Sequence, residues 1–333
     1  MKFKSLVTGL ALSVSALAAT GALATELRLA TIAPDNTVWA NQANRYADRV
    51  NELGGGELSV EVFGNAQLGT MADTMKMTLS GRVDIWFGVT PVMAAVTPEL
   101  ATLTFPYAFD SNEQVKCAVP KLEDDIRAAI GDKYQLITMM SVGTQNVGMV
   151  GEASMPDDLK GKKIRSAPLP SALAFFKGMG ATPQPLSAAE TPAALSTGLV
   201  EGVDLATAFY VVTGSNKTAS NLIKTGHVIN VASLIVSART WKKLSDEEKA
   251  ILMQAADAVP FETVVDEIVA FESQMEQAHI GGGGTVTELS DEERAAWTDL
   301  GRGTWDAVLD DMGDDAKAFM DKVQAARASC AAS

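Results

Sequence analysis

Residues 27–63 read LRLATIAPDNTVWANQANRYADRVNELGGGELSVEVF and contain a complete strand–helix–strand pattern. Apolar and polar side chains alternate over residues 27–31, which predicts a strand with one buried face. Residues 37–53 carry apolar side chains at helical spacing, and the glycines at 54–56 end that helix. Alternation returns over residues 58–62, so the stretch predicts the first unit of an α/β layer.

The same order of elements continues and then repeats further along the chain. A second helix, residues 70–80, ends at Gly81, and VDIWFGV at 83–89 is apolar enough to predict a buried strand. The repeat consists of a strand at 164–165, a helix at 171–177, an extended segment at 182–186, a helix at 188–197 and a strand that begins VEGVDLATAF at 200. Two such units predict two α/β lobes, each with a sheet flanked by helices. A ligand cleft is expected where the carboxyl ends of their strands face each other.

The C-terminal third is predicted to be mainly helical after one more strand, VASLIVSA at 231–238, which is expected to cross back to the first lobe. Ser245 and Ser290 each stand three residues before a glutamate, as in a capping box. The helix that Ser245 opens is expected to be kinked at Pro260. The predicted organisation is a signal peptide at 1–24, lobe I at 25–148 with about 232–245, lobe II at 149–231, and C-terminal helices at 246–333 that bridge both lobes.

The N-terminus predicts export. Lys2 and Lys4 precede an apolar run at 6–19 and a small-residue cleavage site at 22–24, which together form a secretory signal peptide. The run is too short for a comfortable membrane span, although an uncleaved anchor helix is the alternative interpretation. The formal net charge of −14 at pH 7 argues against binding to nucleic acid or to an anionic membrane. We therefore expect a soluble periplasmic protein.

The chain contains two cysteines, Cys117 and Cys330. In an oxidising compartment an isolated pair forms a disulfide more often than it stays reduced. The disulfide would hold the C-terminal tail against the first lobe. Two unrelated thiols are the alternative.

Residues suited to catalysis are scarce. His227 and His279 are the only histidines, and each is expected at the surface or at a helix end. The sequence has no HExxH, CxxC, GxSxG or phosphate-loop motif, so it does not indicate zinc, nucleophilic or nucleotide chemistry. Asp84, Glu201 and Asp204 are acids that nothing fixes in a reaction geometry. These observations favour a binding protein without cofactor or metal over an exported hydrolase or lyase.

GKKIRSAPLP, residues 161–170, places Arg165 at the end of a short strand. Small residues and prolines follow it, which leaves space around the guanidinium. A guanidinium is a planar fork that matches a carboxylate, and it keeps its charge when a closing cleft excludes water. The alternative is a structural arginine paired with a neighbouring acid at the strand end.

Several stretches occur in a fixed order over nearly the whole mature chain: residues 27–63, then QLGTMADTMKMTLSGRVDI, PELATLTFPYAF, DDLKGKKIRSAP, GATPQPLSAAETPAALSTGLVEGVD and SARTWKKLSDEEKAIL. Together they resemble the DctP-type solute-binding proteins of tripartite ATP-independent periplasmic (TRAP) transporters. The resemblance implies a two-lobed, type II-like periplasmic-binding-protein fold. It also implies a receptor that holds a small organic acid through Arg165 and delivers it to small and large integral membrane subunits. The receptor of an ABC-type importer is the nearest alternative.

Two positions depart from the pattern of this family. Leu205 stands where many members have a ligand-contacting asparagine, and Gln145 stands where many have a second arginine. The loss of polar groups favours a small carboxylate or sulfonate over a sugar acid. The candidate ligand-binding residues are Arg165, Gln145, Trp39, Trp86, Asp204, Leu205 and Phe209, with the aromatic ones as cleft walls. A monomer is expected.

Overall fold

The computed structural model describes residues 24–330. Apart from Ala24, the predicted signal peptide lies outside the described residues. Within them the strands form one nine-stranded sheet in the order β2-β1-β3-β8-β4-β7-β5-β6, with β9 paired to β8. The strands are β1 (Thr25–Ala30), β2 (Leu58–Phe63), β3 (Ile85–Val89), β4 (Tyr134–Met149), β5 (Lys163–Ser166), β6 (Thr182–Pro185), β7 (Gly202–Ala206), β8 (Asn221–Ser237) and β9 (Thr285–Thr287).

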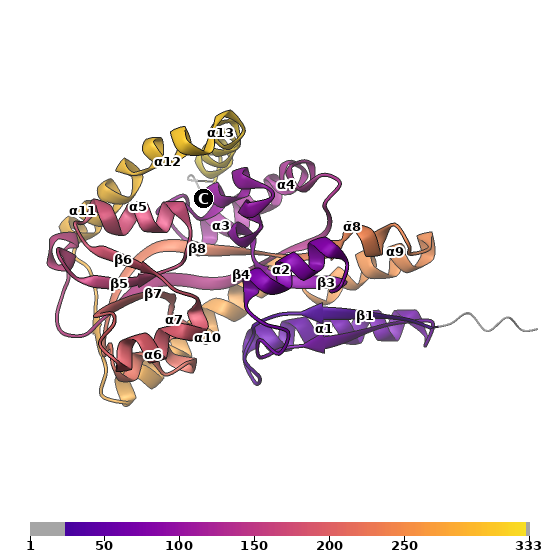
Figure 1. Ribbon diagram of the computed structural model, residues 1–333, viewed down its shortest axis with the longest axis horizontal. Coiled ribbons are helices and arrows are strands. Elements are labelled where there is room, and N and C mark those ends of the chain that lie inside the picture. The colour runs from indigo at the N-terminus through magenta and orange to yellow at the C-terminus, as the bar shows by residue number, and fades with distance from the viewer. Residues whose placement is uncertain (1–23, 331–333) are drawn as a thin grey trace, which may run out of the picture.

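The sheet has two parallel ends joined by two long antiparallel strands (Figure 1). β1 pairs in parallel with β2 and β3, and β5 pairs in parallel with β6 and β7. β8 lies against β3 at one end of the sheet, β4 lies against β7 at the other, and β4 and β8 pair with each other. The two predicted units are therefore the two lobes, and the two-lobed α/β fold predicted from the sequence is confirmed.

β4 and β8 are single strands that pass from one lobe into the other. Close to the crossing their register shifts between Ser141 and Gly143 and again between Gln145 and Val147. Such bulges bend and twist a strand pair. Gly143 has a φ of 104°, a conformation that glycine adopts without strain. The lobe boundaries expected at 148/149 and 231/232 fall inside these strands, because one continuous ladder serves both lobes.

Helices cover both faces of the sheet. In β3, Ile85 and Phe87 pack into one core cluster and Trp86 into another, as expected of alternating side chains in a strand buried on both faces. Within residues 24–330, no helix combines the length and the apolar content that crossing a membrane requires. Lobe I carries α1 (Val38–Gly54), α2 (Met71–Ser80), η1 (Thr90–Ala95), η2 (Pro98–Thr104), α3 (Asn112–Lys121) and α4 (Glu123–Ile130). Lobe II carries η3 (Pro156–Leu159), α5 (Pro170–Gly178), η4 (Ala188–Glu190), α6 (Thr191–Ser196), α7 (Thr207–Val212) and η5 (Ser215–Lys217).

The helices that follow β8 make up the C-terminal part of the chain. They are α8 (Ala238–Trp241), α9 (Asp246–Gln254), η6 (Ala255–Ala258), α10 (Phe261–Gly281), α11 (Asp291–Gly303), α12 (Trp305–Met312) and α13 (Asp314–Ala328). Both capping boxes are present: Ser245 accepts from the Glu248 amide at 3.1 Å, and Ser290 from the Glu293 amide at 3.3 Å. Pro260 separates α9 and η6 from α10, because proline cannot donate the helical hydrogen bond.

The last helices pack on both lobes (Figure 1). Trp297 of α11 lies in the core of lobe II, where its ring centroid is 6.0 Å from that of Phe175. Trp305 of α12 and Phe319 of α13 lie in the core of lobe I instead. The C-terminal segment therefore connects the lobes a third time, in addition to β4 and β8.

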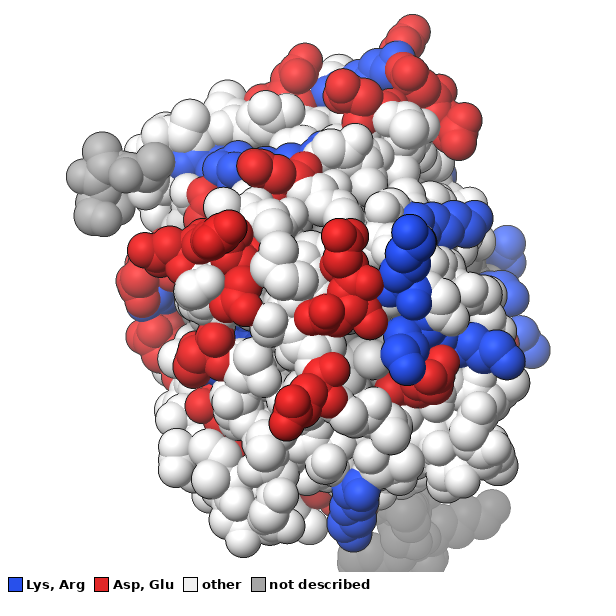
Figure 2. All heavy atoms as spheres, turned by 90° about the vertical axis from the view of Figure 1, so that its left-hand side faces the viewer, with Lys and Arg blue, Asp and Glu red and all other residues white. Residues whose placement is uncertain are grey.

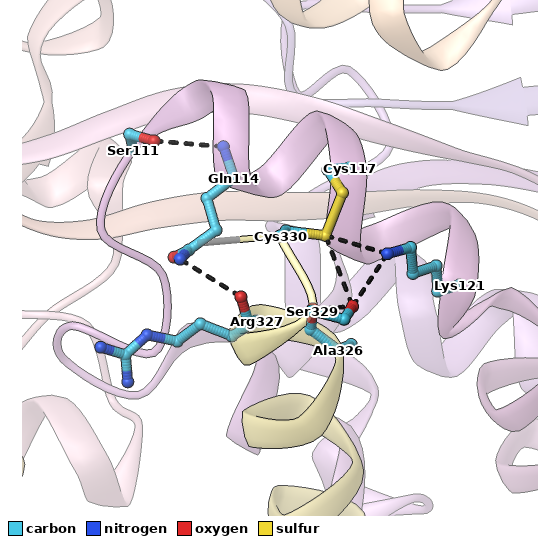
Figure 3. The surroundings of a disulfide bond; sticks show 8 residues. All are labelled: Ser111, Gln114, Cys117, Lys121, Ala326, Arg327, Ser329 and Cys330. Atoms are coloured by element: carbon cyan, nitrogen blue, oxygen red, sulfur yellow. Dashed lines mark hydrogen bonds between the residues drawn. A yellow bond between two sulfur atoms is a disulfide. The ribbon is translucent and has the colours of Figure 1, made fainter. Parts of the chain in front are cut away.

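A disulfide holds the end of this segment on lobe I (Figure 3). It joins Cys117 of α3 to Cys330, with the two Cα atoms 5.9 Å apart. Beside it, the Lys121 ammonium donates to the Ser329 hydroxyl at 2.8 Å. The pair suggested by the sequence is the pair that the structure joins, and it closes a loop with a sequence separation of 213 residues.

Candidate ligand-binding site

A narrow cavity lies between the two lobes. Thr104 and Pro106 line it from lobe I, Ser171 and Asp204 line it from lobe II, and Gln145 lines it from the crossing strand β4. Its volume is about 20 Å³, which is room for about one water molecule. A solute larger than a water molecule would require this cavity to widen.

Asp204 and His227 form a buried pair on one side of this cavity. Asp204 is 1% exposed and His227 is 2% exposed. His227 Nε2 donates to Asp204 Oδ1 at 3.1 Å, because a carboxylate can only accept, and the Thr225 hydroxyl lies 2.7 Å from His227 Nδ1. The ring of Phe175 stacks on the imidazole, with the centroids 5.0 Å apart. These contacts fix the orientation of the Asp204 carboxylate.

The expectation of a surface or helix-end position is wrong for His227. The residue lies inside β8 and lines the cavity. His279 does lie in the last turn of α10, but it is only 1% exposed and bonds the Thr285 carbonyl at 3.1 Å. His227 was misplaced because the strand was expected to begin at residue 231, whereas β8 begins at Asn221.

Arg165 lies near the end of β5 and is 3% exposed. Its Nε donates to the Leu186 carbonyl at 3.0 Å, and its Nη1 donates to the Asp204 carbonyl at 2.6 Å. Nη2 has no hydrogen bond to any described residue. Burial lowers the pKa of the guanidinium, while the charges of Asp204 and Glu190 act in the opposite direction. The two bonded partners are carbonyl oxygens and not, as in the structural alternative, a neighbouring carboxylate.

Arg165 and Asp204 stand on neighbouring strands, and their side chains leave the sheet on opposite faces. In the parallel register of β5 and β7, Arg165 is opposite Val203, and Asp204 is the next residue along β7. The described lining of the cavity includes Asp204 and does not include Arg165. The guanidinium therefore lies on the opposite face of the sheet from the Asp204 carboxylate, and it bonds the cavity-lining residue only through the Asp204 carbonyl.

Trp39 and Phe209 face each other across the lobes. Their ring centroids are 6.0 Å apart, and Trp39 also meets Phe271 of α10 edge-on at 5.5 Å. The indole is 3% exposed. This aromatic cluster joins α1, α7 and α10, and the described lining of the cavity contains none of the three rings.

Two of the predicted site residues lie in hydrophobic cores. Trp86 is fully buried in lobe I, and its Nε1 donates to the Thr74 hydroxyl at 3.1 Å. Leu205 is 5% exposed and packs in the core of lobe II. The structure thus brings Gln145 and Asp204 to the cavity, whereas Arg165 and Trp86 are not among the described residues that line it.

Glu272 of α10 is a buried acid that the sequence analysis did not identify. It is 9% exposed, and its Oε1 accepts from the Thr144 amide at 2.9 Å, beside the bulge in β4. Burial raises the pKa of this carboxyl to about 8, against hydrogen bonds from Thr144 and Thr207. Glu272 follows Ile268 by four residues on the buried stripe of the helix, which is the signal that would have identified it.

Comparison with known proteins shows similarity over nearly the whole chain. The sequence profile of bacterial extracellular solute-binding protein, family 7 (DctP), matches residues 29–311. A solute-binding protein of Roseobacter denitrificans is 29% identical over 73% of this chain and 76% of its own length. The sialic acid-binding periplasmic protein SiaP of Vibrio cholerae is 27% identical over 78% of this chain and 81% of its own length.

A solved structure supports the same fold. A TRAP periplasmic solute-binding protein from Desulfovibrio desulfuricans, with bound sn-glycerol-3-phosphate, has a TM-score of 0.84 at 22% identity, covering 91% of this chain and 97% of its own. The fold and the family are those of solute-binding receptors rather than of enzymes. Because the profile matches most of the sequence, the chain belongs to the DctP family, the solute-binding proteins of TRAP transporters.

Proposed function

We propose that the protein is the solute-binding receptor of a TRAP transporter and that its predicted signal peptide directs it to the periplasm. It captures a small organic acid anion between its lobes and delivers the anion to small and large integral membrane subunits. It acts as a monomer and binds its ligand without a cofactor or a metal ion.

The observation that carries this proposal is the bonding of Arg165. Its side chain is 3% exposed and bonds two carbonyls of lobe II, and one nitrogen, Nη2, makes no hydrogen bond to the described protein. Nη2 can still donate to an acceptor, and a charged donor favours an anion, so this position is suited to an acidic ligand. A carboxylate satisfies it with charge-assisted hydrogen bonds. The carbonyls of Leu186 and Asp204 already orient the guanidinium, so little ordering remains for the ligand to induce.

The ligands named for similar proteins support an anion as the solute. SiaP of Vibrio cholerae is named for sialic acid. The similar structure from Desulfovibrio desulfuricans contains sn-glycerol-3-phosphate, and one from Chromohalobacter salexigens contains D-glucuronate. We extend to this chain the acidic character of these solutes and none of the individual ligands.

The proposed site consists of Arg165 together with Gln145 and Asp204, which line the cavity. Trp39 and Phe209 were expected as walls of the cleft. We propose instead that the contact between their rings holds the lobes together around the ligand. Leu205 supports the site from the core of lobe II. Trp86, which lies in the core of lobe I, is not part of the proposed site.

An enzymatic function would have to use Thr225, His227 and Asp204, whose hydrogen bonds follow the order of a nucleophile–base–acid triad. Thr225 is 0% exposed, and it is not among the described residues that line the cavity. A substrate in the cavity would not reach its hydroxyl. Steady consumption of a bound ligand by the purified protein, lost on His227→Gln, would support the enzyme instead.

A thermal-shift screen of carboxylates and sulfonates on the mature chain tests the receptor. A ligand that binds only the folded state raises the Tm. Arg165→Ala should abolish this shift, and Arg165→Lys should weaken binding by about 2 kcal/mol or more, because an ammonium lacks the planar fork.

The matched control is Arg294→Ala, which removes an exposed arginine of α11. This variant should bind as the unchanged protein does. Circular dichroism should show the same fold in all variants. If a folded Arg165→Ala protein binds the ligand with unchanged affinity, Arg165 does not contact the ligand.

A further inference from the structure

Tyr107 lies between two helices of lobe I in the sequence, but its side chain lies in the core of lobe II. Its neighbours Phe105 and Phe109 pack in the core of lobe I, whereas Tyr107 packs in the lobe II cluster. Its ring centroid is 6.3 Å from that of Phe175, and the residue is 5% exposed. A single residue of the segment between η2 and α3 is therefore inserted into the opposite lobe.

The polar groups of Tyr107 are bonded to β8 and to α11. Its amide donates to the His227 carbonyl at 2.7 Å, and its hydroxyl donates to the Thr225 carbonyl at 3.1 Å. Its own carbonyl accepts from Arg302 at 3.4 Å. A Cβ at Gly301 would lie 2.6 Å from Cδ2 of the tyrosine ring, so α11 packs directly on the ring. These contacts surround Tyr107 on several sides.

The backbone of Tyr107 is in the left-handed region, with a φ of 60°, which is unfavourable for a bulky side chain. Within residues 24–330, the other non-glycine residues with a positive φ are two asparagines and an alanine. A conformation of this kind persists only where the surrounding contacts determine it. Burial of the aromatic ring outweighs its cost here, because the ring removes a large apolar area from water. The contacts with lobe II therefore determine the path of this segment.

This attachment reaches the cavity between the lobes through Pro106. Pro106 lines the cavity, and so does His227 of β8. The amide that follows Pro106 is the Tyr107 amide, which donates to the His227 carbonyl. The wall formed by Pro106 can therefore separate from β8 only if Tyr107 leaves lobe II.

We propose that Tyr107 is a positioning residue of the solute-binding site, which holds Pro106 against β8 whatever the separation of the lobes. Phe105 stays in the core of lobe I, so the lobes turn about the short segment between Phe105 and Tyr107. The cavity then widens at its other walls. This inference goes beyond the proposed function, because it depends neither on the identity of the solute nor on the role of Arg165.

Hydrogen–deuterium exchange on the solute-free mature chain, resolved to single amides, tests the attachment. The Tyr107 amide should exchange as slowly as the amides of β8, because its acceptor is the His227 carbonyl of that strand. Exchange of the Tyr107 amide that is about tenfold faster or more would mean that the residue leaves lobe II when the lobes separate. That result overturns the proposal.

Substitution of Tyr107 tests the consequence for the lobes. Spin labels on Asp48→Cys of α1 and Lys217→Cys of η5, both exposed positions, report the separation of the lobes by double electron–electron resonance. The two native cysteines are joined to each other and do not react with the label. Tyr107→Ala should broaden the distribution of distances, because the ring no longer attaches the segment to lobe II. Tyr107→Phe keeps the ring and should restore the narrower distribution.

The matched control is Tyr134→Ala. Tyr134 is 3% exposed and packs in the core of lobe I, so the loss of its ring should lower stability without changing the distances between the lobes. If Tyr107→Ala and Tyr134→Ala give the same distribution of distances, Tyr107 does not position the lobes and the proposal is overturned. If Tyr107→Ala does not fold, the exchange rate of the Tyr107 amide in the unchanged protein decides the matter.

Discussion

In the proposed site, the polar groups that folding leaves unbonded would decide which ligand the cleft recognises. Arg165 keeps an unbonded Nη2, whereas Leu205 contributes only apolar surface to the core of lobe II. Gln145 lines the cavity with a neutral amide. Within the part of the chain that the structure describes, this site offers one guanidinium, which one acidic group on a ligand satisfies.

A monoacid should therefore bind more tightly than a diacid of equal chain length. A second carboxylate would be buried close to Asp204 without a cation, at a cost on the order of 2 kcal/mol or more. Isothermal titration calorimetry with matched pairs should give a Kd at least tenfold lower for the monoacid. Tighter binding of the diacid would mean that a further cation enters the cleft. Lys177 and Arg239, both exposed, would then be substituted first.

Sequence periodicity located the helices well but located the crossing strands poorly. The helix expected at 37–53 is α1, Val38–Gly54, because an apolar stripe, a capping threonine and terminal glycines mark its ends. β8 begins ten residues before the expected strand, since Lys224 and Gly226 interrupt its apolar pattern. A short strand such as β9, Thr285–Thr287, gives no periodic signal at all.

The candidate site could also be predicted only in part, because its contacts join strands that are distant in the sequence. The role of Arg165 remains a prediction, made from its own neighbours in sequence and from the resemblance of the chain to a family. The contact of Asp204 with His227 was not, because it joins β7 to β8 across β4. The register of these strands depends on bulges near Gly143 and Gln145, which leave no mark in a hydrophobic pattern.

α10 contains a carboxyl that should make stability depend on pH. Burial raises the pKa of Glu272 to about 8 in the folded protein from a usual value near 4.5, with the charge of Glu276, one turn further along, acting in the same direction. The folded state then binds more protons than the unfolded state between these two values. The stabilisation is complete below about pH 4.5 and is lost as the pH rises through about 8, on the order of a few kcal/mol.

Glu272→Gln should flatten this dependence, because glutamine still accepts from the Thr144 amide but does not titrate. Urea denaturation at several pH values between 5 and 8.5 measures it. The control is Glu262→Gln, in the first turn of the same helix. An equal slope in the Glu272→Gln protein would assign the pH dependence to other groups.

The disulfide between α3 and the C-terminal end should contribute strongly to stability. Cross-linking a loop of this length removes unfolded-state entropy worth about 5 kcal/mol in the chain-entropy description. Replacing Cys117 and Cys330 together by serine should lower the free energy of unfolding by several kcal/mol and should leave ligand affinity unchanged. Guanidinium denaturation and calorimetry measure the two quantities. A large loss of affinity would mean that the tail positions the cleft.

Across the whole molecule, the net charge has the same sign as the charge of the proposed ligand. The chain carries a formal net charge of −14, yet it is proposed to bind an anion. Acidic side chains spread over much of the face in Figure 2, and basic ones gather toward one side of it. A surface of this kind repels an approaching anion at long range. In the proposed site, the attraction for an anion would then come from the buried guanidinium of Arg165.

The association rate of a monoanion should consequently rise with ionic strength, because salt screens the long-range repulsion. The rate for a zwitterion should change less. Stopped-flow tryptophan fluorescence between about 10 and 300 mM salt covers the range over which the screening length changes most. A rate that falls with salt for the monoanion would indicate a local basic entrance to the cleft.

The continuous ladder of β4 and β8 has a consequence for how such receptors change over generations. Each lobe contains one part of β4 and one part of β8. Neither lobe is therefore encoded by an uninterrupted stretch of sequence that contains its own sheet. A recombination event that replaced one lobe would have to join foreign halves of two paired strands in the correct register, at the bulges. New solute preferences in this architecture should therefore arise by point substitution at single positions, such as Gln145 and Leu205, rather than by the exchange of whole lobes between genes.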